Sequence, residues 1–474
     1  MYESWQTNYN EIKEDIERFE RMDSGEKSFF FDVHTIESIF DFFTDKYQFD
    51  KAEKILSIGI LQHPNATSLK VKQAIILMEK GDDKNAVQLL QNLSKIETSN
   101  PEVYLNLGLL YLRNDHTEEA ETCFTHALEI AFDDREEILL DIGVFFNQQE
   151  AFKKAIQFLK PACNEYPENE NLLFELAYAY DKEFDFNNGL NTYLKVIDLN
   201  PFSENAWYNL GILYTKDNEF EKAINCYDYA LAIMPDHGEA LFNKANALVS
   251  LNKPAEAIDC YIEYISLGFD TVLPYHYIAD CLEQMGQAEE SLRYYRLTTT
   301  KTPDYMPAWL NYLATLINRE MVEEAIEAST VALNHHHDIG ELWYLRARAL
   351  LLNNDKKQAQ KAFEMALEDD PDSLRNLYEL YQLKIELNPK ASGFDFLKKW
   401  KQKYPESPAV HYLFCAHYLL EERNLNKAVH YLDLALEADP GIDLFLDLFP
   451  KVEKMIKKSK KLSQVIDKHL NHEL

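Results

Sequence analysis

Apolar and small residues recur along this chain at steps of three and four, which is the period of an amphipathic α-helix. Residues 204–235 show the pattern most clearly, as two groups separated by a polar break at 216–219 and closed by Pro235. The first group is Trp207, Leu210, Gly211 and Tyr214, and the second is Ala223, Tyr227 and Ala230. The pattern predicts a helical hairpin with its helices at about 204–217 and 220–233.

The same pattern recurs every 34 residues in both directions from Glu204. It predicts twelve units that begin at Val33, Thr67, Pro101, Glu136, Glu170, Glu204, Gly238, Val272, Met306, Gly340, Leu374 and Pro408. One extra residue is needed near 133–134 and another in the last unit. A contact position in the second helix is small in all units but the last: Ala52, Ala86, Ala120, Ala155, Gly189, Ala223, Ala257, Ser291, Ala325, Ala359 and Gly393. Small residues there let the two helices of a hairpin approach closely.

This unit resembles the tetratricopeptide repeat, because every signature position of that repeat is filled in 204–235. The resemblance implies an all-α fold, a right-handed superhelical α-solenoid of about twelve helical hairpins with capping helices at both ends. We expect a capping helix and linker at 1–32, twelve repeats at 33–440 and basic capping helices at 441–474. The chain also resembles the all-repeat cytoplasmic proteins that are common in Bacteroidetes.

The composition narrows the classes of partner. The net charge is −32, from 80 acidic and 48 basic residues, and such a field repels nucleic acid and anionic membranes. It fits either a solvated outer surface or the recruitment of a basic partner. We also find no apolar run long enough for a membrane span and no signal-peptide pattern at the N-terminus.

The cysteines and histidines offer little chemistry. Six cysteines are scattered without a CxxC pair, and three of them occupy one position of the second helix: Cys123, Cys226 and Cys260. That repetition favours packing, and reduced thiols favour a cytoplasmic location. The run 335–337 is three consecutive histidines, which cannot share one helix face. With no phosphate loop and no HExxH motif, we expect no catalytic residue, no cofactor and no metal.

A candidate binding surface lies on the first helices. In tetratricopeptide solenoids the second, fifth, ninth and twelfth positions of the first helix point into a concave groove, and the resemblance implies the same here. The fifth and ninth positions are one helical turn apart, and both are apolar or aromatic from the unit that begins at Thr67 to the unit that begins at Glu204. We predict a partner-binding groove formed by Leu109, Val144, Phe174, Tyr178, Tyr208 and Ile212. The alternative is that the fifth position packs between neighbouring first helices.

Two functions remain open at this stage. The first is a non-catalytic scaffold or adaptor that binds a peptide or a partner helix in the groove, where acidic surroundings favour a basic or amphipathic partner. The second is an architectural subunit of a larger assembly, or a solenoid that associates with itself through its end units. The sequence leaves the partner and the oligomeric state open.

Overall fold

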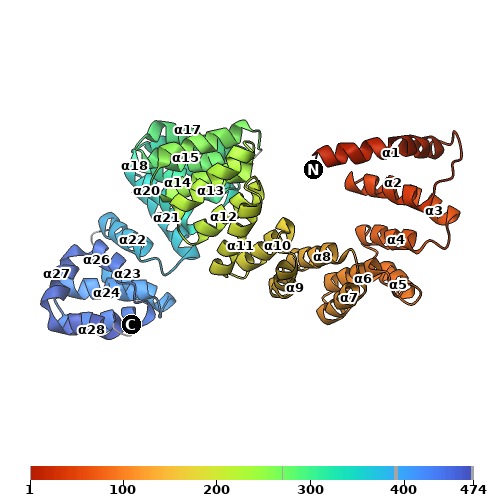
Figure 1. Cartoon of the computed structure of the whole chain (residues 1–474). Helices are drawn as coiled ribbons and strands as arrows, with labels where there is room; N and C mark the ends of the chain where they lie inside the picture. The colour runs from red at the N-terminus through yellow and green to blue at the C-terminus, as the bar shows by residue number, and fades with distance from the viewer. Residues whose placement is uncertain (1, 270, 389–392, 471–474) are drawn as a thin grey trace. The chain divides into compact units, whose positions relative to one another are not determined.

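The computed structural model describes residues 2–269, 271–388 and 393–470, and within these ranges it contains 28 helices and no strand (Figure 1). The all-α prediction is therefore confirmed. The chain divides into an N-terminal unit, Met1–Pro235, and a C-terminal unit, Asp236–Leu474.

The N-terminal unit contains the first thirteen helices. They are α1 (Tyr2–Asp23), α2 (Val33–Asp45), α3 (Phe49–Gln62), α4 (Thr67–Glu79), α5 (Asp83–Leu93), α6 (Pro101–Arg113), α7 (Thr117–Ile130), α8 (Arg135–Gln148), α9 (Phe152–Glu165), α10 (Glu170–Lys182), α11 (Phe186–Leu199), α12 (Glu204–Lys216) and α13 (Phe220–Ile233).

The C-terminal unit contains the other fifteen. They are α14 (Gly238–Ser250), α15 (Pro254–Ser266), α16 (Leu273–Gln284), α17 (Ala288–Lys301), α18 (Met306–Asn318), α19 (Val322–His335), α20 (Gly340–Leu352), α21 (Lys356–Asp369), α22 (Leu374–Leu387), α23 (Gly393–Lys403), α24 (Pro408–Leu420), α25 (Leu425–Ala438), α26 (Asp443–Leu448), α27 (Pro450–Lys458) and α28 (Lys460–Leu470).

Consecutive helices pack in pairs, and each pair packs on the next within its unit. In the N-terminal unit α6 packs on α7, α8 on α9, α10 on α11 and α12 on α13, while the first helices α6, α8, α10 and α12 also touch in order. In the C-terminal unit α16, α18 and α20 touch in the same way. Each unit is therefore a solenoid-like stack of helical hairpins, in which a hairpin buries its apolar faces against its neighbours.

In most hairpins, one residue of the connection between the two helices has a left-handed backbone conformation. Ten residues with positive φ recur at steps of 34 or 35, and only two of them are glycines: Tyr47, Gly81, Asp115, Glu150, Phe184, Asn218, Asn252, Gly286, Glu320 and Asn354. Their φ angles lie between 56° and 75°. This conformation costs a non-glycine residue about 1 kcal/mol. Each of these residues is the middle one of the three residues that connect two helices.

Glycines in the first helices make close packing possible. A Cβ atom on Gly108 would lie 2.5 Å from the ring of Phe124, and one on Gly211 would lie 2.5 Å from the ring of Tyr227. Both rings belong to the second helix of the same hairpin and are fully buried. The large ring therefore fills the space that the missing side chain leaves, as in other close-packed interiors.

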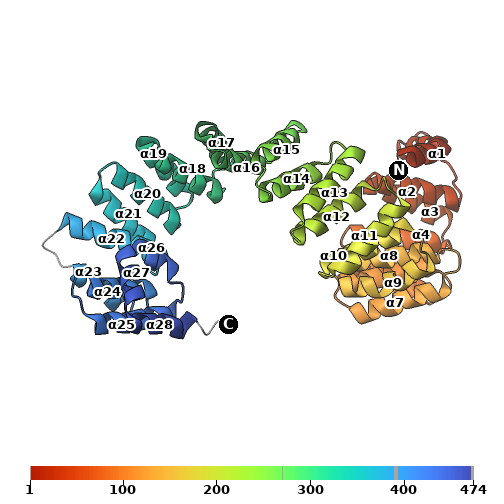
Figure 2. The same cartoon turned by 60° about the vertical axis from the view of Figure 1, so that its left-hand side comes forward.

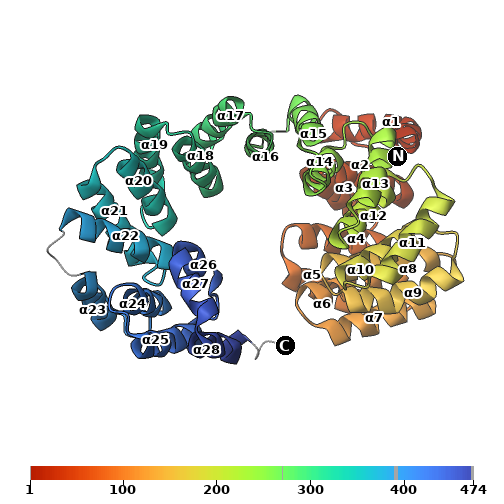
Figure 3. The ribbon, with the colours of Figure 1, turned by 90° about the vertical axis from the view of Figure 1, so that its left-hand side faces the viewer.

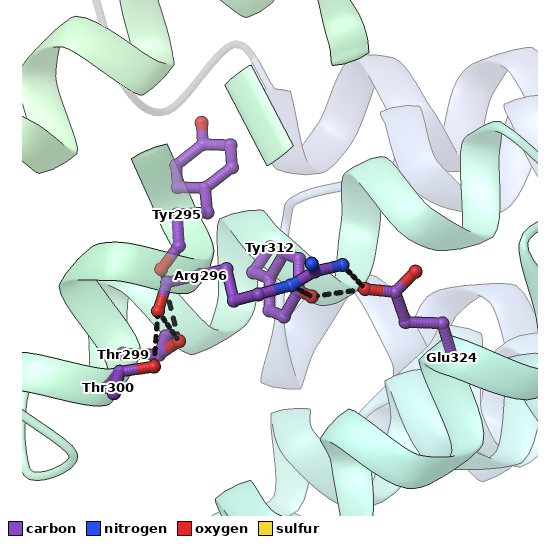
Figure 4. Close-up of polar contacts among 6 residues, drawn as sticks. All are labelled: Tyr295, Arg296, Thr299, Thr300, Tyr312 and Glu324. Carbon is purple, nitrogen blue, oxygen red and sulfur yellow. Dashed lines mark hydrogen bonds and ion pairs between the residues drawn. The ribbon is translucent and has the colours of Figure 1, made fainter. Parts of the chain in front are cut away.

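A polar cluster ties three successive helices of the C-terminal unit together (Figure 4). The hydroxyl of Tyr312 on α18 donates to Oε1 of Glu324 on α19 over 2.6 Å. Arg296 on α17 donates from Nε to the Tyr312 hydroxyl over 3.3 Å and forms an ion pair with Glu324. Within α17, the hydroxyl of Thr300 donates to the main-chain carbonyl oxygen of Arg296 over 2.7 Å. The contacts of the guanidinium with Tyr312 and Glu324 join α17 to the next hairpin.

The first and last helices, α1 and α28, pack on neighbouring helices of their own unit. Phe19 of α1 is fully buried, with its ring 5.6 Å from that of Phe43. At the other end α28 packs on α25, where Lys468 and His469 both contact Asp433. Among the described residues, no helix combines the length and the apolar character that crossing a membrane requires.

Candidate functional site

The six predicted groove residues lie on four neighbouring first helices of the N-terminal unit. Leu109 is on α6, Val144 on α8, Phe174 and Tyr178 on α10, and Tyr208 and Ile212 on α12. Because α6, α8, α10 and α12 touch in order, the fold brings all six onto one run of helices (Figure 1).

Their exposure is intermediate rather than high. Leu109 is buried, with 8% of its surface exposed, and it packs into the core of the hairpins before it. The other five are half-buried. These side chains therefore form a partly covered apolar surface, each with one side in the fold and another toward solvent.

The aromatic rings of the fifth position pack on the second helix of their own hairpin. The ring of Phe174 lies 6.0 Å from that of Tyr193, and the ring of Tyr208 lies 6.1 Å from that of Tyr227. Tyr193 and Tyr227 are fully buried. These contacts lie within one hairpin, whereas the alternative interpretation placed the fifth position between neighbouring first helices. They restrict the movement of both rings.

Carboxylates crowd the same helices, and our sequence interpretation missed them. The pKa of Asp141 on α8 is raised to about 6, because burial penalises its charged form and because Glu137 and Glu102 lie nearby. Burial also raises the pKa of Glu175 on α10. Asp141 and Glu175 occupy the sixth position of successive repeats, so reading that position along the chain would have found them. The apolar residues therefore sit beside a concentrated negative charge.

Two polar contacts connect neighbouring first helices next to this charge. The side-chain amide of Asn147 on α8 donates to Oε2 of Glu175 on α10 over 2.7 Å. The ammonium of Lys216 on α12 donates to both carboxylate oxygens of Asp181 on α10, over 2.8 and 2.7 Å. Asp181 is buried, whereas the Lys216 side chain is 41% exposed. The lysine thus neutralises a carboxylate that the fold has taken out of water.

We predict that Asp141→Asn stabilises the protein at neutral pH. The folded-state pKa of about 6 lies above the ordinary value of 3.8, so the folded chain loses stability as the pH rises from about 4 to 6 and Asp141 ionises. Removing that charge should raise the free energy of unfolding by about 1 kcal/mol at pH 7.5, after allowance for solvent screening. The gain should vanish at pH 4. Urea unfolding at both values measures it.

The matched control is Asp198→Asn on α11, where the side chain is exposed. It should change the free energy of unfolding by less than about 0.5 kcal/mol at either pH. A gain at position 141 that is equal at pH 4 and pH 7.5 would contradict the electrostatic explanation.

The cysteines are unsuited to nucleophilic chemistry. All six are free thiols, five of them buried and Cys123 half-buried. Burial raises the pKa of Cys123 and Cys163 to about 11 and that of Cys226 to about 12, which leaves negligible thiolate at neutral pH. Their packing role fits these surroundings.

Family models and solved structures place the chain among known proteins. Three models are described as tetratricopeptide repeat. The first matches residues 204–237, the second matches residues 101–134, 171–203 and 238–267, and the third matches residues 341–373. A fourth model, described as TPR repeat, matches residues 76–115. None of the curated proteins compared with the sequence matches it.

Three solved structures illustrate the similarity. YrrB, described as a TPR protein with an unusual peptide-binding site, is 19% identical over 40% of this chain and 96% of its own, with a TM-score of 0.35. A tetratricopeptide repeat protein from Parabacteroides merdae is 20% identical over 53% of this chain and 98% of its own, with a TM-score of 0.38. Yeast Tom70 is 13% identical over 91% of this chain and 98% of its own, with a TM-score of 0.36.

Proposed function

Since the chain belongs to the tetratricopeptide repeat superfamily, we propose that it is a non-catalytic protein-interaction scaffold. The proposed binding surface is the run of first helices α6, α8, α10 and α12 in the N-terminal unit. Its occupant would be a peptide or partner helix with basic and apolar side chains.

One observation carries this proposal: half-buried apolar side chains and partly desolvated carboxylates lie on the same helices. Tyr178 and Ile212 each keep part of their surface in water, so a partner that covers them gains from the burial of apolar area. Asp141, with its raised pKa, would be relieved by a nearby cation. A basic amphipathic segment supplies both contacts at once.

The rigidity of the surface supports the same conclusion. Phe174 and Tyr208 are braced by buried tyrosines of the second helices, so little side-chain freedom remains to be lost on binding. Ordering a free side chain costs about 0.5–1.5 kcal/mol, and a braced ring avoids most of that cost. Aromatic anchors of this kind commonly carry the binding energy of an interface.

We expect site-specific photo-cross-linking in the native cell to identify the partner. A photoreactive phenylalanine at position 212 should cross-link one protein strongly, because Ile212 faces the proposed occupant. The same group at position 229 is the control, since Tyr229 is 55% exposed on the second helix α13. Equal cross-linking from both positions would refute the placement. A product of two copies of this chain from position 212 would favour the self-associating alternative.

A charge-reversal variant tests the same surface quantitatively. Tyr178→Glu combined with Ile212→Glu should weaken capture of the cross-linked partner at least about tenfold, because each carboxylate must be desolvated beside existing negative charge. Tyr229→Glu should leave capture unchanged. Circular dichroism checks that the helical content of both variants stays native. Undiminished capture by the folded double variant would exclude this site.

A further inference from the structure

The chain turns back onto its own repeats after the last hairpin. Following α25, residues 439–442 lead into the six-residue helix α26, which packs against α22, while α27 packs against α24 and α28 against α25. Figures 2 and 3 show α26 and α27 alongside α22 and α24, each of which is the first helix of its hairpin in the C-terminal unit. A segment of the protein therefore covers the first-helix side of its last repeats.

Two phenylalanines spaced four residues apart, Phe445 on α26 and Phe449 just after it, make the ring contacts of this segment. The Phe445 ring lies 4.8 Å from that of Tyr412 on α24, and the Phe449 ring lies 5.0 Å from that of Tyr378 on α22. Phe445 is fully buried and Phe449 is 8% exposed. The Tyr412 hydroxyl also donates to the carbonyl oxygen of Asp439 over 2.8 Å. These rings fix the segment to the surface.

Tyr378 and Tyr412 occupy the fifth position of their repeats, the same position as Phe174 and Tyr208 in the N-terminal unit. Phe174, Tyr208 and Tyr378 are half-buried, whereas Tyr412 is almost fully covered. The covering atoms include those of α26. The segment packed against Tyr412 and Tyr378 therefore offers aromatic side chains at i and i+4, with Phe445 on α26 and Phe449 just after it.

The surface continues beyond α26. A cavity of about 380 Å³ lies between the start of α20, the start of α22 and α26, where Leu444 forms one wall. Tyr344, the fifth-position residue of α20, lines it together with Asn376. The Asn376 side chain adds a polar group to this lining and is itself 7% exposed. A segment longer than α26 would therefore find additional apolar and polar contacts here.

We propose that a second peptide-binding surface lies at Tyr344, Tyr378 and Tyr412. In this chain α26 occupies the surface. A partner segment with two aromatic residues four positions apart binds there by displacing α26. A six-residue helix is too short to be stable by itself, so α26 is held only by its docking. Its tether gives it an effective concentration on the order of millimolar, so an external segment must bind more tightly than a free copy of α26. The cavity beside Tyr344 supplies the additional contacts.

The test uses the full chain and a peptide of its own sequence. A fluorescent peptide of residues 440–450 should bind the Phe445→Ala, Phe449→Ala double variant at least about tenfold more tightly than the wild type, because its site is then open. A peptide with both phenylalanines changed to alanine is the control and should bind neither protein. Absence of binding to a folded double variant would overturn the proposal, as would equal binding to the variant and the wild type.

Hydrogen exchange of the wild-type chain keeps the proposal falsifiable if the double variant does not fold. Amides of α26 should exchange at least about tenfold faster than those of α24, because undocking opens α26 alone. Equal protection of the two helices would mean that α26 is an integral part of the core, and would overturn the proposal. Neither result depends on the surface proposed for the N-terminal unit.

Discussion

Replacing Phe124 with alanine should lower the free energy of unfolding by about 4 kcal/mol, the typical cost of a Phe→Ala change in a core. Phe124 is fully buried on α7, and its ring occupies the space in front of Gly108 and lies 5.4 Å from the ring of Phe146 on α8. Alanine would leave a cavity that joins two hairpins. Urea unfolding followed by circular dichroism measures the loss.

The same substitution at Phe132 is the control. That side chain is 94% exposed just after α7, so Phe132→Ala should change the free energy of unfolding by less than about 0.5 kcal/mol. A second comparison uses Gly108→Ala, which should destabilise the wild type but be tolerated in the Phe124→Ala background, because the clashing ring is gone. Equal costs in both backgrounds would show that this pair does not set the helix spacing.

Replacing Lys216 with methionine should cost about 2 kcal/mol, the second-largest effect we expect. The substitution keeps an unbranched apolar side chain but removes the ammonium that contacts both oxygens of buried Asp181. An unpaired buried carboxylate costs about 3–5 kcal/mol when burial is complete, and the partial exposure of Lys216 reduces that figure. Because the pair joins α10 to α12, the loss should appear in urea unfolding of the full chain.

Lys222→Met is the matched control for this prediction. Lys222 contacts Glu219 over 3.3 Å, but both side chains are about half exposed, so the loss should be below about 0.5 kcal/mol. Adding Asp181→Asn to Lys216→Met should restore part of the stability, since the uncompensated charge is then removed. A double variant that is less stable than Lys216→Met would indicate that the pair acts through packing and not through charge.

The stability and the proposed binding surface depend on the same helices. The pair of Asp181 and Lys216, the contact of Asn147 with Glu175, and the braced ring of Phe174 all lie on α8, α10 and α12. Variants that probe binding are therefore best placed at half-exposed apolar residues such as Ile212. There a loss of capture can be separated from a loss of fold.

The helical hairpins could be predicted from the sequence alone. Helix formation depends on residues three and four positions apart, and successive hairpins repeat with a period of 34 residues. Both patterns involve residues close in the sequence, so both can be recognised there. The glycines and alanines at the contact positions, such as Gly211, also indicated where two helices meet, and the structure places the ring of Tyr227 there.

The way in which these hairpins present their side chains could not be predicted from the sequence, because it depends on how the helices pack. The charge near Asp141 arises where Glu102 of another helix comes close, and the coverage of Tyr412 arises from Phe445, 33 residues further along the chain. The left-handed turn at Phe184 likewise follows from helix packing, since phenylalanine has no preference for it. Such features depend on distances between residues remote in the chain, and those distances are fixed only when the helices pack.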